Sequence, residues 1–395
     1  MRTLNRRPAS RAAPVREAKM SRILSWALIA ASTGLVLLAS PGGASAEHNE
    51  KVLYTFLGGG DGQYPDGKLI WDGAGNIYGA TYTNVYKITP HGRKTVVHVF
   101  SDGPGVSGVV RDDAGNLYGV TTNGGDDNDG TVFEIAADGK VTTLYSFKGG
   151  SDGAYPYSEL IRDGQGNLYG TTNRGGTGDN GTIFKIAPDG TETVLHRFNG
   201  SVDGGNPVAG LVMDGAGNFY GAAQAGPFGN GNVFRMSPNG DLTVLYNFHG
   251  YDGSDPWGTL IMDPEGNLYG TTLGGGAYRR GTVFELSPKG EMTSLHSFGR
   301  GTDGRGLQGG LVRGADGSLY GGTYDGGTFN KGTVFKIKPN GKETVLYSFT
   351  GGSDGWSLSG TPLLDSNGIV YGASDLGGFC STSTNGCGVF FKLKH

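Results

Sequence analysis

The sequence predicts an all-β protein that folds as a seven-bladed β-propeller with four strands in each blade. Three observations lead to this fold class. Glycine is unusually abundant, and one unit of about fifty residues recurs seven times. The first and last segments of the repeat region have the patterns of a fourth and a third strand, which could pair in one blade. Repeats of this length that contain four strands each are typical of propeller blades.

Composition argues against a helical protein and favours short strands joined by turns. The chain has 395 residues, of which 77 are glycine, whereas the average share of glycine is about 7%. Only 17% of the residues are charged. Length alone would suggest two ordinary domains, but the repeats fill residues 47–395 as a single propeller domain.

An apolar residue followed by Tyr-Gly marks every repeat. The seven tyrosines are Tyr78, Tyr118, Tyr169, Tyr220, Tyr269, Tyr320 and Tyr371, with successive spacings of 40, 51, 51, 49, 51 and 51 residues. In the third repeat the runs that suit strands are residues 159–163, 166–172, 182–186 and 192–198. A solenoid is the competing repeat architecture, but its units are usually shorter and its ends do not close a ring.

The two ends of the repeat region contain a device for ring closure. Val52–Phe56 has the pattern of the fourth, outermost strand of a blade, and Val389–Leu393 has the pattern of a third strand. The seventh blade therefore lacks an outer strand of its own. We expect Val52–Phe56 to complete that blade, because the pairing leaves no open sheet edge.

Residues 1–46 have the features of a signal peptide. Basic residues precede an apolar run over residues 23–39, and Ala44-Ser45-Ala46 resembles a cleavage site. A start at Met20 would give a signal of ordinary length, and an uncleaved membrane anchor is the alternative. The sequence therefore predicts a secreted or periplasmic protein, with no membrane span in the mature chain, and we expect a monomer.

The predicted mature chain is acidic. It retains 25 Lys and Arg against 35 Asp and Glu, a formal charge of −10. A negative surface disfavours nucleic acid as a partner. The partners that we expect instead are an extracellular glycan, peptide or protein.

Many of the polar residues that could carry chemistry occupy repeat positions. Aspartates lie six residues before the repeat tyrosine in six repeats, at Asp72, Asp112, Asp163, Asp214, Asp263 and Asp365. The outermost strands alternate between Tyr and His, which places His98, His196 and His296 at one equivalent position. Active sites are not usually repeated around a ring, so we interpret the aspartates as turn residues and the histidines as packing residues. No catalytic or metal-binding residue is predicted.

Cys380 and Cys387 are the only cysteines, and six residues separate them in the loop between the second and third strands of the last repeat. In an exported protein such a pair is expected to form a disulfide. A zinc site would need a second pair of ligands, which does not accompany them.

In a four-stranded meander, the loops between blades and the loops between the second and third strands emerge at one end of each blade. These loops are longer and more variable than the opposite turns, and we call this end the loop-rich face. Function usually resides on variable loops. The candidate ligand-binding residues on this face are Asp61, Asp152, Asp203, Asp252, Asp303, Asp354, Tyr64, Tyr155, Trp257 and Trp356. Each aspartate precedes a glycine, as does Asp102 in the second repeat, and turn capping is the alternative role.

A short acidic run, Asp126-Asp127-Asn128-Asp129, lies in one of these loops. Carboxylates at close spacing suggest calcium, but the spacing does not match the EF-hand loop. We therefore expect a solvated loop and no cofactor, with calcium as the alternative.

Residues 160–198 and 311–349 each contain the unit Leu-(Ile or Val)-x-(Asp or Gly)-x-x-Gly-x-Leu-Tyr-Gly, then Gly-Gly, Gly-Thr-(Ile or Val)-Phe-Lys-Ile and Thr-Val-Leu. This unit resembles the GloVer tandem repeat, and the resemblance covers residues 51–395. It implies an exported protein, and family members often carry a C-terminal surface anchor. This chain ends on a third-type strand without such a tail, which favours release or a periplasmic location. The family implies no agreed biochemical activity.

The Gly-Asn-Leu-Tyr segments also resemble the propeller of streptogramin lyases, which implies a histidine and acidic residues with Mg²⁺ at the mouth of the channel. His249 is the only histidine in a loop between blades, and no second one accompanies it. We therefore expect a non-enzymatic binding module on the loop-rich face. A structural surface protein without a small ligand, and a metal-dependent lyase or hydrolase, are the alternatives.

Overall fold

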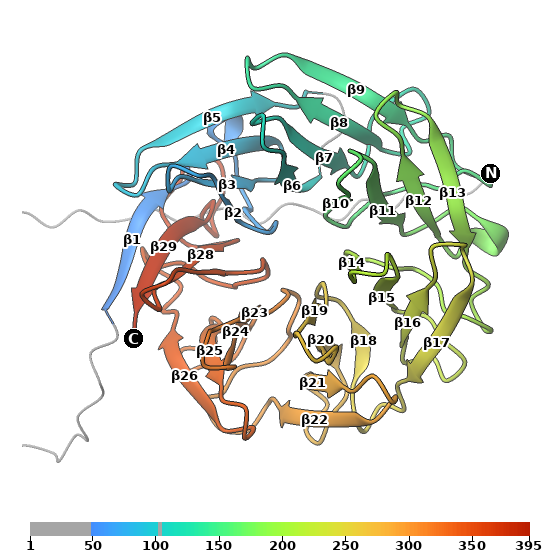
Figure 1. The fold of residues 1–395 in the computed structure, drawn as a ribbon. Coiled ribbons are helices and arrows are strands. Elements are labelled where there is room, and N and C mark those ends of the chain that lie inside the picture. The colour runs from blue at the N-terminus through green and yellow to red at the C-terminus, as the bar shows by residue number, and fades with distance from the viewer. Residues whose placement is uncertain (1–48, 102–104) are drawn as a thin grey trace, which may run out of the picture. The chain divides into compact units, whose positions relative to one another are not determined.

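The computed structural model describes residues 49–101 and 105–395. The predicted signal peptide, the alternative start at Met20 and Asp102 lie outside the described residues. The described residues form one compact unit. Its seven antiparallel sheets are arranged as the blades of a ring, with sequence order running from the centre to the rim in six of them (Figure 1). The chain is thus a seven-bladed β-propeller, as predicted.

The first four blades are regular meanders. Blade 1 contains β2 (Ile70–Trp71), β3 (Ile77–Ala80), β4 (Asn84–Ile88) and β5 (Lys94–Val99). Blade 2 contains β6 (Val106–Arg111), β7 (Leu117–Thr121), β8 (Thr131–Ile135) and β9 (Val141–Ser146). Blade 3 contains β10 (Ile161–Arg162), β11 (Leu168–Thr172), β12 (Thr182–Ile186) and β13 (Glu192–Arg197). Blade 4 contains β14 (Val212–Met213), β15 (Phe219–Ala223), β16 (Asn232–Met236) and β17 (Leu242–Asn247).

The remaining blades include one additional strand and the ring closure. Blade 5 contains β18 (Ser254–Pro256), β19 (Ile261–Met262), β20 (Leu268–Gly274), β21 (Thr282–Leu286) and β22 (Met292–Ser297). Blade 6 contains β23 (Val312–Arg313), β24 (Leu319–Gly322), β25 (Thr333–Ile337) and β26 (Glu343–Ser348). Blade 7 contains β27 (Leu363–Leu364), β28 (Val370–Ser374), β29 (Val389–Lys394) and β1 (Asn49–Thr55). Two short 3-10 helices, η1 (Gly59–Asp61) and η2 (Thr177–Asp179), lie in loops.

The ring closes through its first strand. β1 pairs antiparallel with β29, with Val52 opposite Phe391 and Thr55 opposite Val389. The N–H of Phe56 donates to the carbonyl of Gly388 at 3.0 Å and extends the ladder by one residue. The predicted closing strand is therefore confirmed. It begins at Asn49, three residues before the predicted Val52, and Phe56 lies just past its end.

The repeated aspartates hold the turn between the first and second strands of their blades. Asp72 accepts hydrogen bonds from the N–H of Asn76 at 2.8 Å and from its Nδ2 at 2.7 Å. The same N–H contact recurs at Asp112, Asp163, Asp214, Asp263 and Asp365. In blade 6, where Gly314 replaces the aspartate, Asp316 accepts from Ser318 instead. The turn role predicted for these carboxylates is confirmed.

The hydrophobic core lies between neighbouring blades rather than at one centre. Phe147 of blade 2 packs edge-on against Phe184 of blade 3, with ring centroids 5.0 Å apart, and both rings are fully buried. The same pairing recurs around the ring. Blade 1 departs from the pattern because Tyr86 stands where the other blades have phenylalanine. Each blade thus depends on its neighbour for burial of its apolar face.

Cys380 and Cys387 form the predicted disulfide, with their Cα atoms 5.9 Å apart. Cys387 is fully buried in a cluster with Phe56 and Phe390. The disulfide therefore ties the long loop of blade 7 to the place where the ring closes. No helix in the described part of the chain is long and apolar enough to cross a bilayer.

Candidate ligand-binding site

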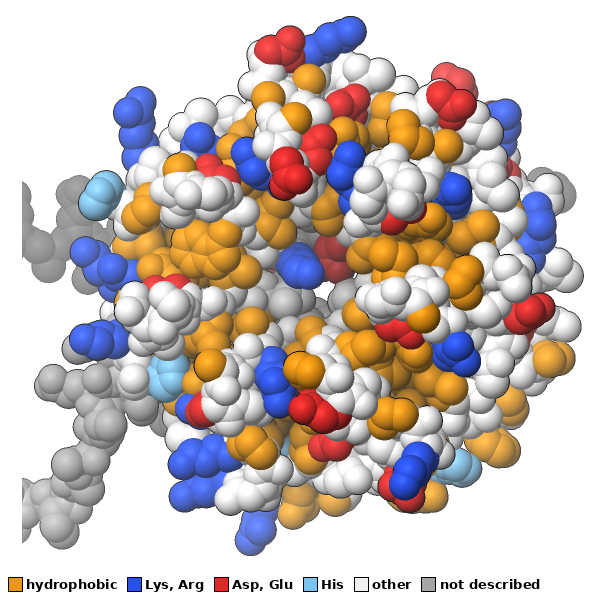
Figure 2. Space-filling view, viewed as in Figure 1, with side chains coloured by type: hydrophobic (Ala, Val, Ile, Leu, Met, Phe, Trp, Pro, Cys, Tyr) orange, Lys and Arg blue, Asp and Glu red, His pale blue; other side chains and the backbone are white. Residues whose placement is uncertain are grey.

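The centre of the ring is narrow because the innermost segments of neighbouring blades nearly touch. A Cβ atom on Gly258 would lie 2.4 Å from the carbonyl oxygen of Gly309, and one on Gly360 would lie 2.6 Å from that of Asp66. Such distances exclude any side chain larger than hydrogen unless the backbone moves. The space-filling view shows the resulting hollow at the centre of the ring, with acidic and basic side chains distributed around it (Figure 2).

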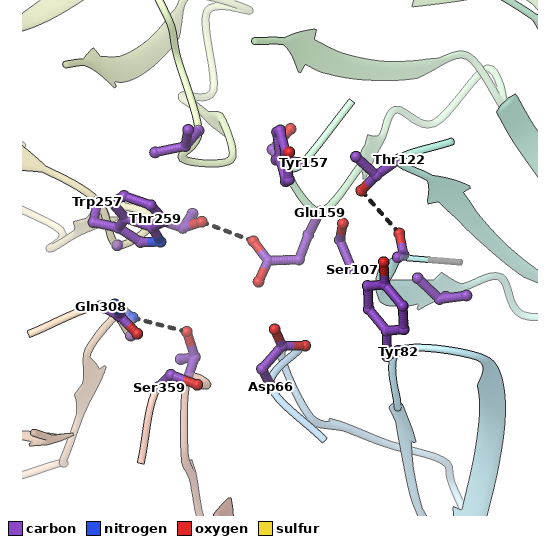
Figure 3. Close-up of a pocket in the computed structure, with 18 of the residues that line it drawn as sticks. Asp66, Tyr82, Ser107, Thr122, Tyr157, Glu159, Trp257, Thr259, Gln308 and Ser359 are labelled. Carbon is purple, nitrogen blue, oxygen red and sulfur yellow. Dashed lines mark hydrogen bonds between the residues drawn. The ribbon is translucent and has the colours of Figure 1, made fainter. Parts of the chain in front are cut away.

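At the loop-rich face the channel widens into a cavity of about 310 Å³. Two repeat positions line it. One set of residues lies where the loops between blades reach the innermost strands, and the other lies just after the second strands. Because every blade contributes at the same depth, side chains about fifty residues apart in sequence converge on one site (Figure 3).

Aromatic side chains form part of the cavity wall. Trp257, Tyr157 and Tyr82 line it from blades 5, 3 and 1. Tyr157 is 48% exposed and Tyr82 is 43% exposed, although large aromatic side chains are usually more buried than this. Hydroxyl groups of Ser359 and Thr122 lie between them. Aromatic faces beside hydrogen-bonding groups are typical of sites that bind sugars and peptides.

Glu159 reaches across the floor of the cavity. The hydroxyl of Thr259, two blades away, donates a hydrogen bond of 2.7 Å to its Oε2 (Figure 3). Gly210 of the intervening blade makes this contact possible, because a Cβ there would lie 2.8 Å from the Thr259 hydroxyl and 3.0 Å from the Glu159 carboxylate.

Asp66 and Asp375 bring two further carboxylates into the cavity. Asp66 is exposed to solvent through the channel mouth, although many protein atoms lie around its carboxylate. Burial, together with Glu159, raises the pKa of Asp66 to about 6. Burial and the nearby Asp66 raise the pKa of Asp375 well above its ordinary value. The hydroxyl of Ser359 donates to Oδ2 of Asp375 at 2.5 Å. The cavity therefore concentrates negative charge that its own walls do not neutralise.

Each of the six Asp-Gly aspartates singled out from the sequence lies in its own turn. Its carboxylate accepts one hydrogen bond from a backbone N–H three or four residues earlier. It also bonds the Tyr or His of the preceding outermost strand, which sequence reasoning had assigned to packing alone. The pairs are Tyr54–Asp61 (2.8 Å), Tyr145–Asp152 (2.7 Å), His196–Asp203 (2.9 Å), Tyr246–Asp252 (2.5 Å), His296–Asp303 (3.2 Å) and Tyr347–Asp354 (2.9 Å). The constant spacing of six or seven residues within these pairs was the available sequence signal. Among the described residues that line the cavity, none is one of these aspartates, and their role in ligand binding stays a prediction.

The four aromatic candidates separate into different environments. Trp257 lines the cavity. Tyr64 and Tyr155 have φ angles of 56° and 55°, and their N–H groups bond the preceding blade at Cys387 and Asp129. Trp356 packs beneath Lys331, whose Nζ lies 3.2 Å from the ring centroid. The structure therefore brings Trp257 together with residues that the sequence analysis did not single out.

Seven of the residues that line the cavity share one repeat position, three before the inner-strand leucine or its equivalent, whereas Tyr82, Glu159 and Asp375 lie at other positions. Around the ring this position holds Asp66, Val106, Tyr157, Val208, Trp257, Gln308 and Ser359. Its side chains vary around the ring, with only valine occurring twice, whereas the next residue is always Gly, Ser or Ala. A variable column inside a uniform repeat was the signal that could have revealed the site.

His249 lies on the rim and not at the cavity. Its ring stacks between Phe228 and Tyr251, with centroids 4.8 Å and 5.6 Å away. Elsewhere on the face, the pKa of Asp129 is raised by burial and by neighbouring carboxylates, first among them Asp127. Within residues 49–101 and 105–395, no group of three or more His, Cys, Asp or Glu is arranged to hold a metal ion. Calcium binding at the Asp126–Asp129 loop stays a prediction.

A ring of seven four-stranded blades with a ligand-sized cavity at one mouth defines the protein as a β-propeller of the repeat-built class. The Gloeobacter/Verrucomicrobia repeat matches residues 30–160, 81–260 and 203–391, which together span most of the chain. The protein belongs to the Gloeobacter/Verrucomicrobia repeat family, which confirms the GloVer resemblance. No curated protein matches the sequence.

Several solved structures share the fold. A streptogramin B lyase is 13% identical with a TM-score of 0.62, and the match covers 88% of this chain and 97% of that one. The virginiamycin B lyase from Staphylococcus aureus is 12% identical with a TM-score of 0.61, covering 88% and 100%. The extracellular domain of a hybrid two-component system from B. thetaiotaomicron is 14% identical with a TM-score of 0.57, covering 84% and 39%. At these identities the likeness shows the fold alone.

Proposed function

We propose that the protein is an exported, non-enzymatic binding module that holds an extracellular ligand in the cavity at the mouth of its channel. The observation that carries this proposal is the convergence of Trp257, Tyr157 and Tyr82, from three blades, on a cavity that also contains carboxylates and hydroxyl groups. Concave sites with aromatic walls and a few convergent polar groups are the usual places where proteins bind small ligands or side chains of a partner.

Export is supported by the disulfide between Cys380 and Cys387, because disulfides persist in oxidising compartments outside the cytosol. The predicted signal peptide is consistent with it. The ligand classes that remain from the sequence are a glycan, a peptide and a segment of a protein. All three present the hydrogen-bonding groups and apolar faces that such a cavity complements.

Two tryptophans on the same face provide a matched test. Trp257→Ala removes part of the cavity wall, and Trp356→Ala removes a ring that instead packs against Lys331. Screening of a glycan array and a peptide array with the wild type identifies binders. We expect Trp257→Ala to weaken their binding tenfold or more, as loss of a central aromatic contact does, and Trp356→Ala to change it less than twofold. Equal losses in both variants would contradict a site in the cavity.

The enzymatic alternative has a separate test. A lyase or hydrolase activity would require turnover that depends on a metal ion and is lost in His249→Ala. His249 is instead stacked on the rim beside Phe228. We expect no turnover of cyclic depsipeptide substrates by the wild type with or without Mg²⁺, and measurable Mg²⁺-dependent turnover would replace the binding-module proposal.

A further inference from the structure

We infer that the cavity at the channel mouth binds an alkylammonium group such as the side chain of a lysine in a peptide or protein. The inference rests on the proposed function, because it names the ligand of the same site. It is carried by three carboxylates, by the aromatic wall above them, and by two buried polar atoms for which the described residues provide no hydrogen-bond partner.

The charge of the cavity is the first argument. Asp66, Glu159 and Asp375 line it, and no Lys, Arg or His is among the described residues that do so. Lys68 holds in blade 1 the repeat position that Glu159 holds in blade 3, but it is not among the residues that line the cavity, and the three carboxylates outnumber it. A concave site lined by one sign of charge focuses its potential on the space inside. A cation in that space is therefore favoured over a neutral or anionic group.

Repulsion by neighbouring carboxylates contributes to the raised pKa values of Asp66 and Asp375. The groups that face Asp66 are the carboxylates of Glu159 and Asp375 and the buried phenol of Tyr86. Burial raises the pKa of Asp66 and of Asp375, and like charge raises them further. An ammonium group among them would relieve the repulsion. A neutral sugar would fit the aromatic wall but would leave the repulsion in place.

Unpartnered buried groups are the second argument. Oδ1 of Asp375 is inaccessible to solvent and, among the described residues, has no hydrogen-bond partner. The hydroxyl of Tyr86 also has no hydrogen-bond partner among the described residues, and its side chain is 0% exposed. Asp66 lies close enough for its carboxylate to raise the pKa of Tyr86 further, after burial. A buried polar atom without a partner costs about 1–3 kcal/mol. An ammonium group carries three N–H donors and can satisfy the Asp375 oxygen once the atoms that cover this oxygen shift.

The depth of the groups indicates an alkyl stem behind the charge. Trp257 lies where the loop between blades joins the innermost strand. Tyr157 is its equivalent in blade 3, and Glu159 follows Tyr157 by two residues, toward the middle of the channel (Figure 3). A lysine side chain that enters past the aromatic rings would place its methylene groups against them and its ammonium among the carboxylates. Aromatic faces also attract cations directly.

A metal ion fits these residues less well than an organic cation. Calcium needs six to eight oxygen ligands that converge at 2.3–2.6 Å, roughly, from the ion. The described carboxylates form no group arranged in that way. Aromatic walls contribute nothing to calcium binding, whereas they stabilise an alkylammonium group.

The test is calorimetric titration of the full propeller at pH 7.5 with N-terminally acetylated tetralysine and with its Nε-acetylated form, which keeps the backbone and removes the side-chain charges. We expect tetralysine to bind at least tenfold more tightly. We expect Asp66→Asn and Glu159→Gln each to weaken its binding at least fivefold. Asp127→Asn, an equal change of charge on the same face outside the cavity, should change it less than twofold. Thermal unfolding of each variant checks that it is folded.

Three outcomes would overturn the inference. The first is equal affinity for charged and Nε-acetylated tetralysine, and the second is equal binding by the wild type and both carboxylate variants. The third is tighter binding of the neutral N-acetylglucosamine tetramer or of Ca²⁺ alone than of tetralysine. Trp257→Ala could weaken the binding of every ligand while Asp66→Asn and Glu159→Gln weaken none. That result would support the binding module and contradict an ammonium ligand.

Discussion

Lys94 at the start of the outer strand of blade 1 forms an ion pair with Asp61 of the preceding turn, with Nζ 2.8 Å from Oδ1 and the lysine side chain only 2% exposed. Three other blades have a glutamate at the position of Lys94. Glu50 faces Asp354, Glu192 faces Asp152 and Glu343 faces Asp303. One interblade position therefore holds an ion pair in one blade and two like charges in three others.

Replacement of one such glutamate by lysine should stabilise the propeller. Burial and Asp152 raise the pKa of Glu192 to about 7, so Glu192→Lys removes a repulsion and recreates the Lys94–Asp61 arrangement. We expect the free energy of unfolding at pH 8 to rise by about 1 kcal/mol, the upper range for a partly exposed pair. Urea denaturation measures it. Lys94→Glu is the converse variant and should be destabilised, and stabilisation of both would contradict this explanation.

The stability of the wild type should fall as the pH rises from 5 to 8. Glu50, Glu192 and Glu343 have pKa values raised to about 7, and that of Asp66 is raised to about 6. A group whose pKa is raised on folding binds more protons in the folded state, so its stabilising effect is lost as pH rises through the folded pKa. The lowered pKa of His98 acts in the opposite direction, but it is one group against these four and Asp375, whose pKa is also raised. Urea denaturation between pH 5 and 8 measures how the free energy of unfolding changes with pH. The decrease should be smaller in Glu192→Lys, and a free energy that rises with pH would refute the prediction.

A methyl group at Gly258 should separate two blades. Its Cβ would lie 2.4 Å from the carbonyl oxygen of Gly309, and backbone atoms cannot yield as a flexible side chain can. We expect Gly258→Ala to lower the free energy of unfolding by about 2 kcal/mol or more. Gly164→Ala is the matched control, because no atom lies within 4 Å of the added Cβ. Equal stability of the two variants would show that the blades have room to move apart.

Reduction of the disulfide should destabilise the closing blade. Cys380 and Cys387 are separated by 7 positions in sequence, and closure of so short a loop contributes about 2–3 kcal/mol in the chain-entropy model. We expect dithiothreitol to lower the free energy of unfolding of the wild type by that amount, measured by guanidinium denaturation. Cys380→Ser should start from the lower value and be unaffected by the reductant. A wild type that is insensitive to reductant would argue against a stabilising disulfide.

Removal of the closing strand should abolish cooperative unfolding. Deletion of residues 51–56 exposes the edge of β29 and removes Phe56, which is fully buried against Tyr86, with ring centroids 5.1 Å apart. An open edge invites pairing with other chains, so we expect aggregation by light scattering or a broad melting transition. Lys51→Ala, which changes one exposed side chain of the same strand, should melt like the wild type. A soluble deletion variant with an unchanged transition would contradict closure by this strand.

Local sequence patterns were sufficient for the blades, for their number and for the closing strand. Tyr-Gly motifs, Asp turns and the strand at Val52 are readable because each acts within one blade or repeats in all of them. The cavity was harder to predict from the sequence. Trp257 was recognised as an aromatic residue on a variable loop, whereas Asp66, Glu159 and Asp375 were not recognised at all, because no local motif marks them.

The sequence by itself therefore determined a ring of seven blades, a disulfide between Cys380 and Cys387, and the end of the ring that carries the variable loops. Only the tertiary structure decided which residues meet. Asp66 and Asp375 belong to the first and last blades, and Glu159 bonds Thr259 across an intervening blade. The physical reason is closure: a curved array of blades brings equivalent positions together only when the last blade has joined the first.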